Sequence, residues 1–435
     1  PCSAAGYLNP LGGISNMGDP CVLHHGDTYY LYPTSNLTGG GPDAGVRVWT
    51  SPDLVNWTPR GWALLNRTTD WGQEAFLAPQ VCFRFGRFYM LYAARNSPTG
   101  PYRICVARSE LPLGPFLEWR APLFDLPGDH FDAYLFLDSD DRSYLYYATA
   151  AAGAVTLWTR EIAPDLSAFV APAPTQVLGP PFAAWEINTT AGAAVVEAPV
   201  VVRLRTGYCL TYSGNIYTAA DYAMGAAYGS LPTGPFTRHP GNPILRANLL
   251  SLPPVSGPGT HDFVASPDGM EFFAFYNIHT RAALGGGDRS PAMDRVTLAP
   301  GNTLTVAGPT VTAQPEPARG GLDRTTTLAR TDTFSTDSLT SAGSTTGWSF
   351  FGTELPGLAF ADHDAAAGAI RLHVAPDASR FRIAGVIANQ AEWLPYAHCG
   401  PQGHIRVKYY LYHGGAAGPP DGHHIPNFRL RAANR

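Results

Sequence analysis

The sequence contains almost no lysine and little charge of any kind. Lys408 is the single lysine among 29 basic residues, and charged residues make up 14% of the 435 positions, well below the usual quarter. The net charge is −5 and the basic residues form no run, which argues against a nucleic-acid or membrane partner. No apolar run reaches the roughly 18 residues that a membrane helix needs. We therefore expect a globular protein, acting as a monomer, with neither partner.

Cysteine is also scarce, and its spacing does not suggest a metal centre. The six cysteines include no CxxC pair, so no zinc site is predicted. Cys2 and Cys21 flank the N-terminal segment and are candidates for a disulfide, whereas the other four suit small buried side chains. The first ten residues, PCSAAGYLNP, do not form a signal peptide. A signal peptide removed earlier, together with four Asn-X-Thr sequons, would fit a secreted or periplasmic protein; the sequons lie at Asn36, Asn56, Asn66 and Asn188.

Helical periodicity is nearly absent, and a β pattern recurs in its place. Each recurrence has an apolar run, a turn with Gly or Asp, an aromatic run and a third strand. The units begin with DPCVLHHGDTYYLY, APQVCFRFGRFYMLY, FDAYLFLDSDDRSYLYY, EAPVVVRLRTGYCLTYS and HDFVASPDGMEFFAFYN, each roughly 50 to 65 residues after the last. Five units of about four strands predict an all-β fold, a five-bladed β-propeller over residues 1–312.

A second module is expected after the propeller. Residues 313–327 are rich in Pro and Gly and lack a β pattern, which is typical of a linker. Residues 328–435 alternate like strands again, and predict a β-sandwich-like module. A packing role for this module is favoured over sugar binding.

Acidic residues stand at the start of several innermost strands of the predicted propeller. When the five units are aligned, the position of Asp19 in the first unit is occupied in the later units by Pro79, Asp132, Glu197 and His261. Because the first strand of each blade lines the central channel, these side chains are predicted to meet at one end of it. Carboxyl groups crowded in a narrow channel repel one another and shift their pKa values apart, which is typical of a catalytic site.

Each of these residues also has a structural alternative. An Asp-Pro pair such as Asp19-Pro20 is common in turns, Asp132 could cap a strand, and His261 could be a satisfied core histidine. Glu197 is the hardest to explain in this way, since it lies between Val-Val and Ala-Pro. The joint occurrence in register favours function.

Taken together, the units GDPCVLHHGDTYYLY, TSPDLVNW, LAPQVCFRFGRFYMLY, FDAYLFLDSDDRSYLYY, EAPVVVRLRTGYCLTYS and GPGTHDF resemble glycoside hydrolase family 43 over about residues 14–310. The resemblance implies an inverting hydrolase of arabinose-, xylose- or galactose-containing polysaccharides, with arabinofuranosidase- or xylosidase-type activity favoured. By position, Asp19 would be the general base, Glu197 the general acid, and Asp132 the carboxylate that tunes the acid's pKa. His261 matches a central histidine that often holds a metal ion or water on the propeller axis, so a structural Ca²⁺ is expected there. No cofactor is needed for the chemistry, and Arg289 would contact substrate.

The sequence departs from the family pattern around the expected sugar platform. Leu77-Ala78-Pro79 replaces the usual Trp-Ala-Pro, so we expect Leu77 at the substrate with Trp71 or Phe76 as the stacking surface. Tyr217, Tyr222 and His279 are further candidates for the rim. Other departures are Gln80 for the usual Asp, Phe131-Asp132-Ala133 for Ile-Asp-Pro, and Thr260-His261 for Gly-His.

Two other classes of propeller protein remain possible from the sequence. A retaining, fructan-type propeller hydrolase would also combine a propeller with a β-sandwich, but its Asn-Asp-Pro, Arg-Asp-Pro and Glu-Cys motifs are missing. Its carboxyl groups would stand about 5 to 5.5 Å apart rather than the 6.5 to 9.5 Å of an inverting enzyme. A non-catalytic sugar-binding propeller would need no acids in the channel.

Overall fold

A computed structural model gives the architecture of the chain. It describes residues 6–318, apart from 26–27, 35–44, 139–141, 205–206, 268–270, 281–284 and 300–302, and five short strands farther on. The chain divides into two compact units, one centred on Pro1–Arg319 and the other on Gly320–Leu394. Cys2, Asn36 and Lys408 lie outside the described residues, as does most of the segment 328–435.

Five antiparallel groups of consecutive strands form the first unit, and a short parallel pairing joins the third and fourth groups into one nine-stranded sheet. Each begins with an innermost strand: β2 (Gly18–His25), β6 (Glu74–Arg84), β10 (Asp129–Leu137), β15 (Ala193–Arg203) and β19 (Gly259–Ala265). These five strands contact one another in cyclic order, and β19 contacts β2. The predicted five-bladed β-propeller is confirmed.

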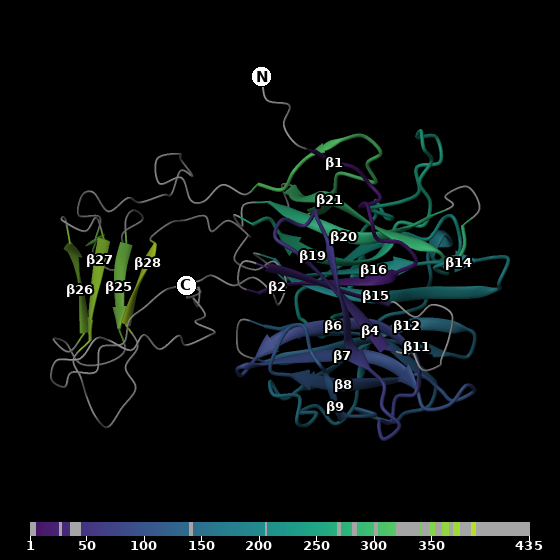
Figure 1. Cartoon of the computed structure of the whole chain (residues 1–435), viewed down its shortest axis with the longest axis horizontal. Helices are drawn as coiled ribbons and strands as arrows, with labels where there is room; N and C mark the ends of the chain where they lie inside the picture. Colours follow the sequence, from purple (N-terminus) through teal and green to yellow (C-terminus); the bar gives the residue numbers. More distant parts are fainter. Residues whose placement is uncertain are drawn as a thin grey trace. The chain divides into compact units, whose positions relative to one another are not determined.

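The other strands extend each blade outward, as β6 to β9 do in Figure 1. Blade one adds β3 (Thr28–Thr34), β4 (Gly45–Ser51) and β5 (Thr58–Leu65); blade two adds β7 (Arg87–Arg95), β8 (Arg103–Ser109) and β9 (Leu117–Arg120). Blade three adds β11 (Ser143–Ala151), β12 (Ala154–Ile162) and β13 (Thr175–Leu178). Blade four adds β16 (Tyr208–Gly214), β17 (Ala223–Gly229) and β18 (Thr237–Arg238); blade five adds β20 (Phe272–His279), β21 (Arg289–Ala299) and β22 (Thr303–Val306). Between blades three and four lie the 3₁₀ turn η1 (Ala184–Glu186) and β14 (Ile187–Asn188), which pairs with β15.

Hydrophobic side chains fill the spaces between neighbouring blades. The second strands of the blades, such as β7, β16 and β20, are buried on both faces. They therefore consist of near-continuous apolar and aromatic residues rather than alternating ones. Tyr29, Phe88 and Phe272 are 1%, 2% and 8% exposed. Tyr29 packs in a cluster formed by blades one and five, and Phe88 in a cluster formed by blades one and two.

Each innermost strand carries a β-bulge at the same end, and β6 has a second register shift between Glu74 and Leu77. The bulge contains a non-glycine residue with positive φ: Asp19 (50°), Ala78 (43°), Asp132 (53°), Ala198 (51°) and Thr260 (37°). Such a conformation is uncommon for residues with a side chain, and most of all for a β-branched one. Because a bulge bends its strand and redirects side chains, it explains how Asp19 at the mouth of a buried strand can face the channel.

The bulges also correct the register read from the sequence. Ala78, Ala198 and Thr260 occupy the backbone position of Asp19, whereas the sequence reading placed Pro79, Glu197 and His261 there. Glu197 comes one residue before the bulge residue of its strand, and His261 one residue after.

The ends of the propeller chain lie together and close the ring. The strand β1 (Gly6–Tyr7) pairs with β23 (Gln314–Pro315), and Ala318 donates a backbone hydrogen bond to Glu271. Asp262, on blade five, accepts a hydrogen bond from the backbone of Val22 on blade one. Residues 314–318, predicted to begin a free linker, are therefore bound to the propeller.

The second unit contains two small sheets. One is formed by β24 (Leu339–Thr340), β25 (Trp348–Gly352) and β28 (Ala384–Ala388), and the other by β26 (Ala359–Asp364) and β27 (Ala369–Val374). The role predicted for the module stays a prediction.

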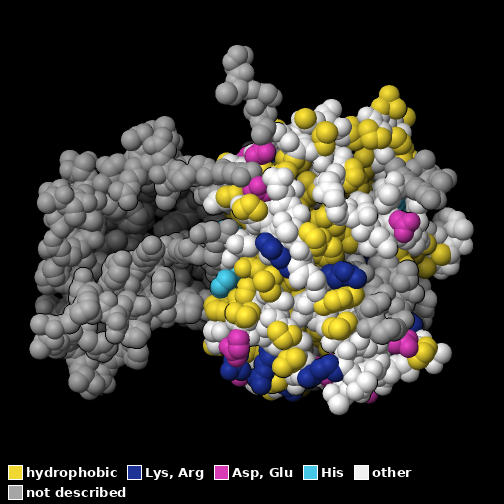
Figure 2. Space-filling model, in the orientation of Figure 1, with side chains coloured by type: hydrophobic (Ala, Val, Ile, Leu, Met, Phe, Trp, Pro, Cys, Tyr) yellow, Lys and Arg dark blue, Asp and Glu magenta, His cyan; other side chains and the backbone are white. Residues whose placement is uncertain are grey.

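Charge is sparse on the first unit. Basic and acidic side chains alternate with uncharged ones over the face shown in Figure 2. Within the described part of the chain, no helix has the length and apolarity required to cross a membrane.

The cysteine and sequon side chains are engaged in the fold. Cys21 is a buried free thiol, and the backbone N–H of Val81 lies 3.2 Å from its sulfur. The structure therefore gives no support to a Cys2–Cys21 disulfide. The amide nitrogens of Asn56, Asn66 and Asn188 each donate a local hydrogen bond, which gives these residues a structural role.

Candidate active site

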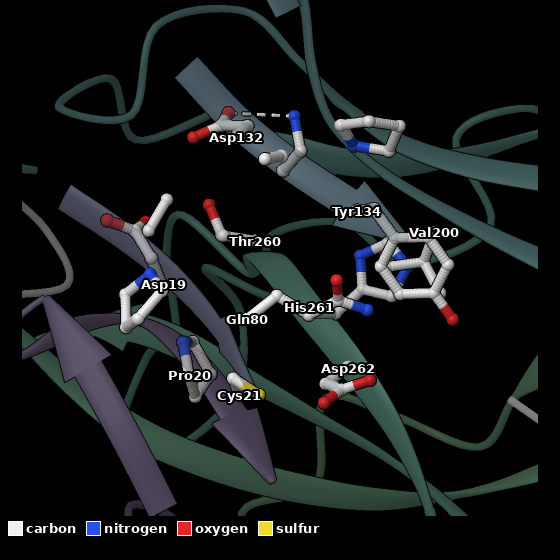
Figure 3. Close-up of a pocket in the computed structure, with 15 residues that line it drawn as sticks. Asp19, Pro20, Cys21, Gln80, Asp132, Tyr134, Val200, Thr260, His261 and Asp262 are labelled. Carbon is white, nitrogen blue, oxygen red and sulfur yellow. Dashed lines mark hydrogen bonds between the residues drawn. The ribbon is translucent and has the colours of Figure 1, made fainter. Parts of the chain in front are cut away.

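The bulged ends of the innermost strands surround a pocket on the propeller axis. Asp19 and Asp132 lie at the end of it away from Asp262, with His261 between (Figure 3). Its volume of about 50 Å³ has room for a few waters but not for a sugar ring. A sugar would therefore have to lie above the mouth, where the acidic side chains stand.

Asp19 is held as an ion pair by a buried arginine. Nη1 of Arg289 donates to Oδ1 of Asp19 at 2.8 Å, and Nη2 donates to Oδ2 at 3.4 Å. The hydroxyl of Thr34 donates to Oδ2 at 2.6 Å, and the backbone N–H of Asp19 donates to the Asn277 side chain. A Cβ on Gly18 would lie 2.0 Å from the arginine Cζ. Only glycine therefore lets the guanidinium reach the carboxylate.

Glu197 stands on blade four in a site that disfavours its charge. Burial raises the pKa of this carboxyl to about 7, and the negative charge of Asp19 raises it as well. The hydroxyl of Tyr222, which donates to Oε1 at 2.9 Å, and the Arg289 charge both lower the pKa. Glu197 is thus poised between its protonated and ionised forms near neutral pH.

Asp132 lies beside Glu197 on blade three. Burial, and then the charges of Glu197 and Asp19, raise the pKa of Asp132 well above its usual value. The backbone N–H of Ala198 donates to its Oδ2 at 2.9 Å, which favours the ionised form (Figure 3). Two carboxyl groups that repel each other in this way share a proton rather than ionise together.

His261 offers one free nitrogen to the axial pocket. Its Nε2 pairs with the Thr211 hydroxyl at 2.7 Å, whereas the buried Nδ1 has no partner. Burial lowers the pKa of the imidazole to about 3, so the ring is neutral. Among the described residues no group of three potential His, Cys, Asp or Glu ligands occurs. Since Ca²⁺ prefers six to eight oxygen ligands, the residues fit only a cation surrounded mostly by water, with Nδ1 as a protein contact.

The predicted stacking platforms on blade two do not all face the substrate. Phe76 is 1% exposed and stacks on Tyr92 within the core, so its predicted substrate contact is wrong. Trp71 is half-buried and packs against the same core cluster. Leu77 immediately precedes the bulge residue, which makes it the blade-two counterpart of Glu197, and it is partly exposed.

Two of the predicted rim residues lie beneath the rim. Tyr222 is fully buried and His279 is 3% exposed; the His279 ring pairs with Ser256 and with the carbonyl of Tyr217. Tyr217 is 44% exposed, and its ring lies over the guanidinium of Arg289, 4.8 Å from its centroid. Of these three residues, only Tyr217 can present an aromatic face to a sugar.

Several supporting residues could not be recognised from the sequence. Tyr222 bridges the Glu197 carboxyl and the Thr260 hydroxyl, and Asn277 bridges Asp19 and Arg289. Spacing carries no signal for these contacts, because they join different blades. Thr34 was easier to predict, because it lies on the next strand of the same blade and pairs with Gly18, the neighbour of Asp19.

Two buried donors near Asp19 have no protein partner. They are Nε of Arg289 and Nδ2 of Asn277. Buried polar groups in native proteins are nearly always satisfied by protein, water or ligand. These two donors thus mark a place for water or substrate oxygen next to the carboxylate.

A five-bladed propeller with three carboxyl groups at one end of its channel, one of them poised to donate a proton, has the architecture of a glycosidase. The model of glycosyl hydrolases family 43 matches residues 7–304. This chain belongs to that family and is a glycoside hydrolase.

Solved structures agree with this assignment. A thermostable family-43 glycoside hydrolase is 38% identical, with a TM-score of 0.66 over 72% of this chain and 99% of that chain. An endo-1,4-β-xylanase from Bacteroides thetaiotaomicron VPI-5482 is 27% identical, with a TM-score of 0.60 over 69% and 98%. An α-L-arabinofuranosidase from Lactobacillus brevis, 20% identical with a TM-score of 0.59 over 70% and 97%, shares the fold. No curated protein sequence matches the chain.

Proposed function

We propose that this protein hydrolyses arabinose- or xylose-containing poly- or oligosaccharides with inversion, using Glu197 as general acid and Asp19 as general base. The observation that carries the proposal is the contrast between the two carboxyl groups. Arg289 holds Asp19 in an ion pair, whereas burial raises the pKa of Glu197 to about 7. A carboxylate fixed by an arginine, opposite a carboxyl group with a raised pKa, suits the base and acid roles respectively.

Glu197 supplies the proton to the leaving oxygen. Hydrolysis passes through an oxocarbenium-like state, and the bond breaks more readily when the departing oxygen is protonated. Asp132 keeps the proton on Glu197 through its own charge. The backbone N–H of Ala198 donates to its carboxylate and favours the ionised form, and that negative charge opposes ionisation of the neighbouring acid.

Asp19 takes a proton from the attacking water on the other face of the sugar. It stands on blade one, separated from blade four by blade five, which suits a pair that must leave space for both sugar and water. Arg289 fixes the direction of its oxygens. The water then attacks the anomeric carbon as the leaving sugar departs with the proton from Glu197.

The family and its solved members support the substrate class. One similar structure is described as an endo-1,4-β-xylanase and another as an α-L-arabinofuranosidase. The exposed ring of Tyr217 and the partly exposed Leu77 offer apolar surface to a sugar face. Galactose-containing chains belong to the same screen.

The proposal also covers a structural cation, the location of the enzyme and its oligomeric state. A hydrated cation at Nδ1 of His261 would have a structural role, and no step of the reaction passes through it. Secretion or export to the periplasm suits an enzyme whose substrate is a polysaccharide, and we propose that location, with the enzyme acting as a monomer.

The roles are tested with aryl glycosides that carry good and poor leaving groups. In Glu197→Gln, kcat/KM should fall about 10²- to 10⁴-fold for poor leaving groups and much less for nitrophenolate, which needs no proton. In Asp19→Asn, kcat/KM should fall by the same factor for good and poor leaving groups, because the base acts on water. Parental rates in both variants would refute the assignment.

A further inference from the structure

A second pocket opens beside the acid on blade four. Its volume is about 400 Å³, within the range of small-molecule sites. One wall is the turn 188–191 and the other is the segment 215–221, which follows β16. Nothing in the reaction described above uses it.

Hydrogen bonds hold the walls of this pocket in place. The Asn188 amide nitrogen donates to the Asn215 carbonyl oxygen at 2.9 Å, and the backbone N–H of Ala191 donates to the Asn188 side chain at 2.7 Å. Backbone bonds from Gly286 to Thr218 and from Gly257 to Ala220 tie the other wall to blade five. The pocket is thus formed before any ligand arrives.

The same segment reaches both catalytic carboxyl groups. Asn215 lies two residues beyond Ser213, the ladder partner of Glu197, so the pocket begins about 7 Å along the strand from the acid. Tyr222 ends the segment and donates to Glu197. Between them, Tyr217 covers Arg289, which holds Asp19. The segment that forms one wall of the pocket therefore borders the site on its blade-four side.

The lining favours a neutral, hydroxyl-rich ligand. It presents amides and hydroxyls from Asn188, Thr189, Thr190 and Thr218, together with the exposed carboxylate of Asp221. None of its lining residues is basic, so an anion would meet only repulsion from Asp221. Sugars combine several hydroxyl groups with no charge and match this set.

We propose that this pocket binds the sugar unit on the leaving-group side of the scissile bond. The inference rests on the proposed roles of Glu197 and Asp19. The general acid must contact the departing oxygen, so the departing sugar lies on the acid's side, away from the base. The pocket is on the blade that carries Glu197, whereas Asp19 is on blade one. An oligosaccharide would thus gain contacts here that a simple aryl glycoside lacks.

The test compares two substrates of one sugar, a nitrophenyl glycoside and the matching oligosaccharide. Ala191→Trp fills the exposed edge of the pocket, and Thr218→Val removes one hydroxyl without changing its shape. The ratio of kcat/KM for oligosaccharide over aryl glycoside should fall about tenfold in Ala191→Trp and about threefold in Thr218→Val. Ala168→Trp is the matched control, because Ala168 is also exposed but follows β12 on blade three, beyond the end of that strand opposite to Ala154, which pairs with Ala194.

A ratio in Ala191→Trp equal to that of Ala168→Trp would overturn the inference while leaving the catalytic roles intact. Calorimetric titration of the same oligosaccharide into the parent and both tryptophan variants gives an answer that does not need turnover. Weaker binding confined to Ala191→Trp supports the pocket, and equal binding refutes it. Failure of the parent to cleave either substrate would instead refute the proposed function.

Discussion

The hydroxyl group of Tyr222 lies 2.9 Å from Oε1 of Glu197 and donates a hydrogen bond to it. A donor to the charged form of an acid favours that form, so Tyr222 lowers the pKa of Glu197 while burial raises it to about 7. The tyrosine is fully buried and is backed by the hydroxyl of Thr260. Burial and one positioned hydroxyl thus act in opposite directions on the protonation of Glu197.

Replacing Tyr222 by Phe should move the alkaline limb of the pH profile upward. Activity requires protonated Glu197, so the parent should lose kcat/KM as pH rises through about 7. Without the tyrosine hydroxyl the acid holds its proton to higher pH, by about 0.5 to 1 pH unit. A pH–rate series on one aryl glycoside measures the shift. Tyr217→Phe, which changes an exposed tyrosine on the same segment, should leave the limb in place, and an unmoved limb in Tyr222→Phe would exclude the tuning role.

The three acids could be recognised from the sequence because each follows a recurring signal. An apolar strand preceded by an acid occurs in blades one and three, and Glu197 is conspicuous inside Val-Val-Glu-Ala-Pro. The blade count follows from repetition alone. Their exact register could not be read, because a bulge residue such as Ala198 or Thr260 has no compositional signature when it is not glycine.

The surroundings of the acids were mostly beyond sequence reasoning. Trp71 precedes the second innermost strand and Phe76 lies near its start, yet Phe76 stacks inside the core whereas Trp71 is half-buried. Burial depends on which blade packs against which face, and spacing does not encode that. The ion pair of Arg289 with Asp19 was not foreseen, and it forms because Gly18 opens the path between them. The substrate contact predicted for Arg289 stays a prediction.

Adding a methyl group at Gly18 should impair catalysis by displacing Arg289. An alanine Cβ there would lie 2.0 Å from the guanidinium carbon, so the arginine must move and Asp19 loses its clamp. A misplacement of about 1 Å in a catalytic group costs roughly 10²-fold in rate, and we expect a loss of that size in kcat for Gly18→Ala.

The matched variant is Gly12→Ala, where a Cβ would meet no atom within 4 Å. It should retain parental kcat. Thermal melting of both variants separates a local displacement from unfolding. A Gly18→Ala enzyme that is folded and fully active would show that the Arg289–Asp19 pair does not matter.

Changing Asp132 to Asn should move the alkaline limb in the opposite direction to Tyr222→Phe. The charge of Glu197 raises the pKa of Asp132. The repulsion is mutual, so in the proposed mechanism an ionised Asp132 raises the pKa of Glu197. A neutral amide removes that effect, and Glu197 then loses its proton at lower pH, by about 0.5 to 1 pH unit. The same pH–rate series measures it. An alkaline limb that moves to higher pH in Asp132→Asn, as it should in Tyr222→Phe, would contradict the role given to Asp132.

Acid should destabilise the propeller partly through His261. Burial lowers the pKa of its imidazole from 6.5 to about 3, so below pH 6.5 the unfolded chain binds a proton that the folded chain refuses. The free energy of unfolding should fall as pH decreases, by up to about 1.4 kcal/mol per pH unit from this group, until about pH 3.

Denaturant unfolding of His261→Gln at several pH values checks this contribution. Between pH 6.5 and about pH 5, the variant should lose about 2 kcal/mol less than the parent. His239→Gln, which changes a partly exposed histidine, should retain the parental slope. Identical slopes in the parent and His261→Gln would show that the imidazole accepts its proton in the folded state.

The opposed placement of Glu197 and Asp19 is tested most directly by the anomeric configuration of the first product. Proton NMR on the parent enzyme, recorded before mutarotation, distinguishes the two anomers of the released sugar. With water attacking from the Asp19 side and the leaving group departing on the Glu197 side, the first sugar should appear with inverted configuration. A product that first appears with retained configuration would mean that one of these carboxylates bonds to the sugar, and that no water stands between them.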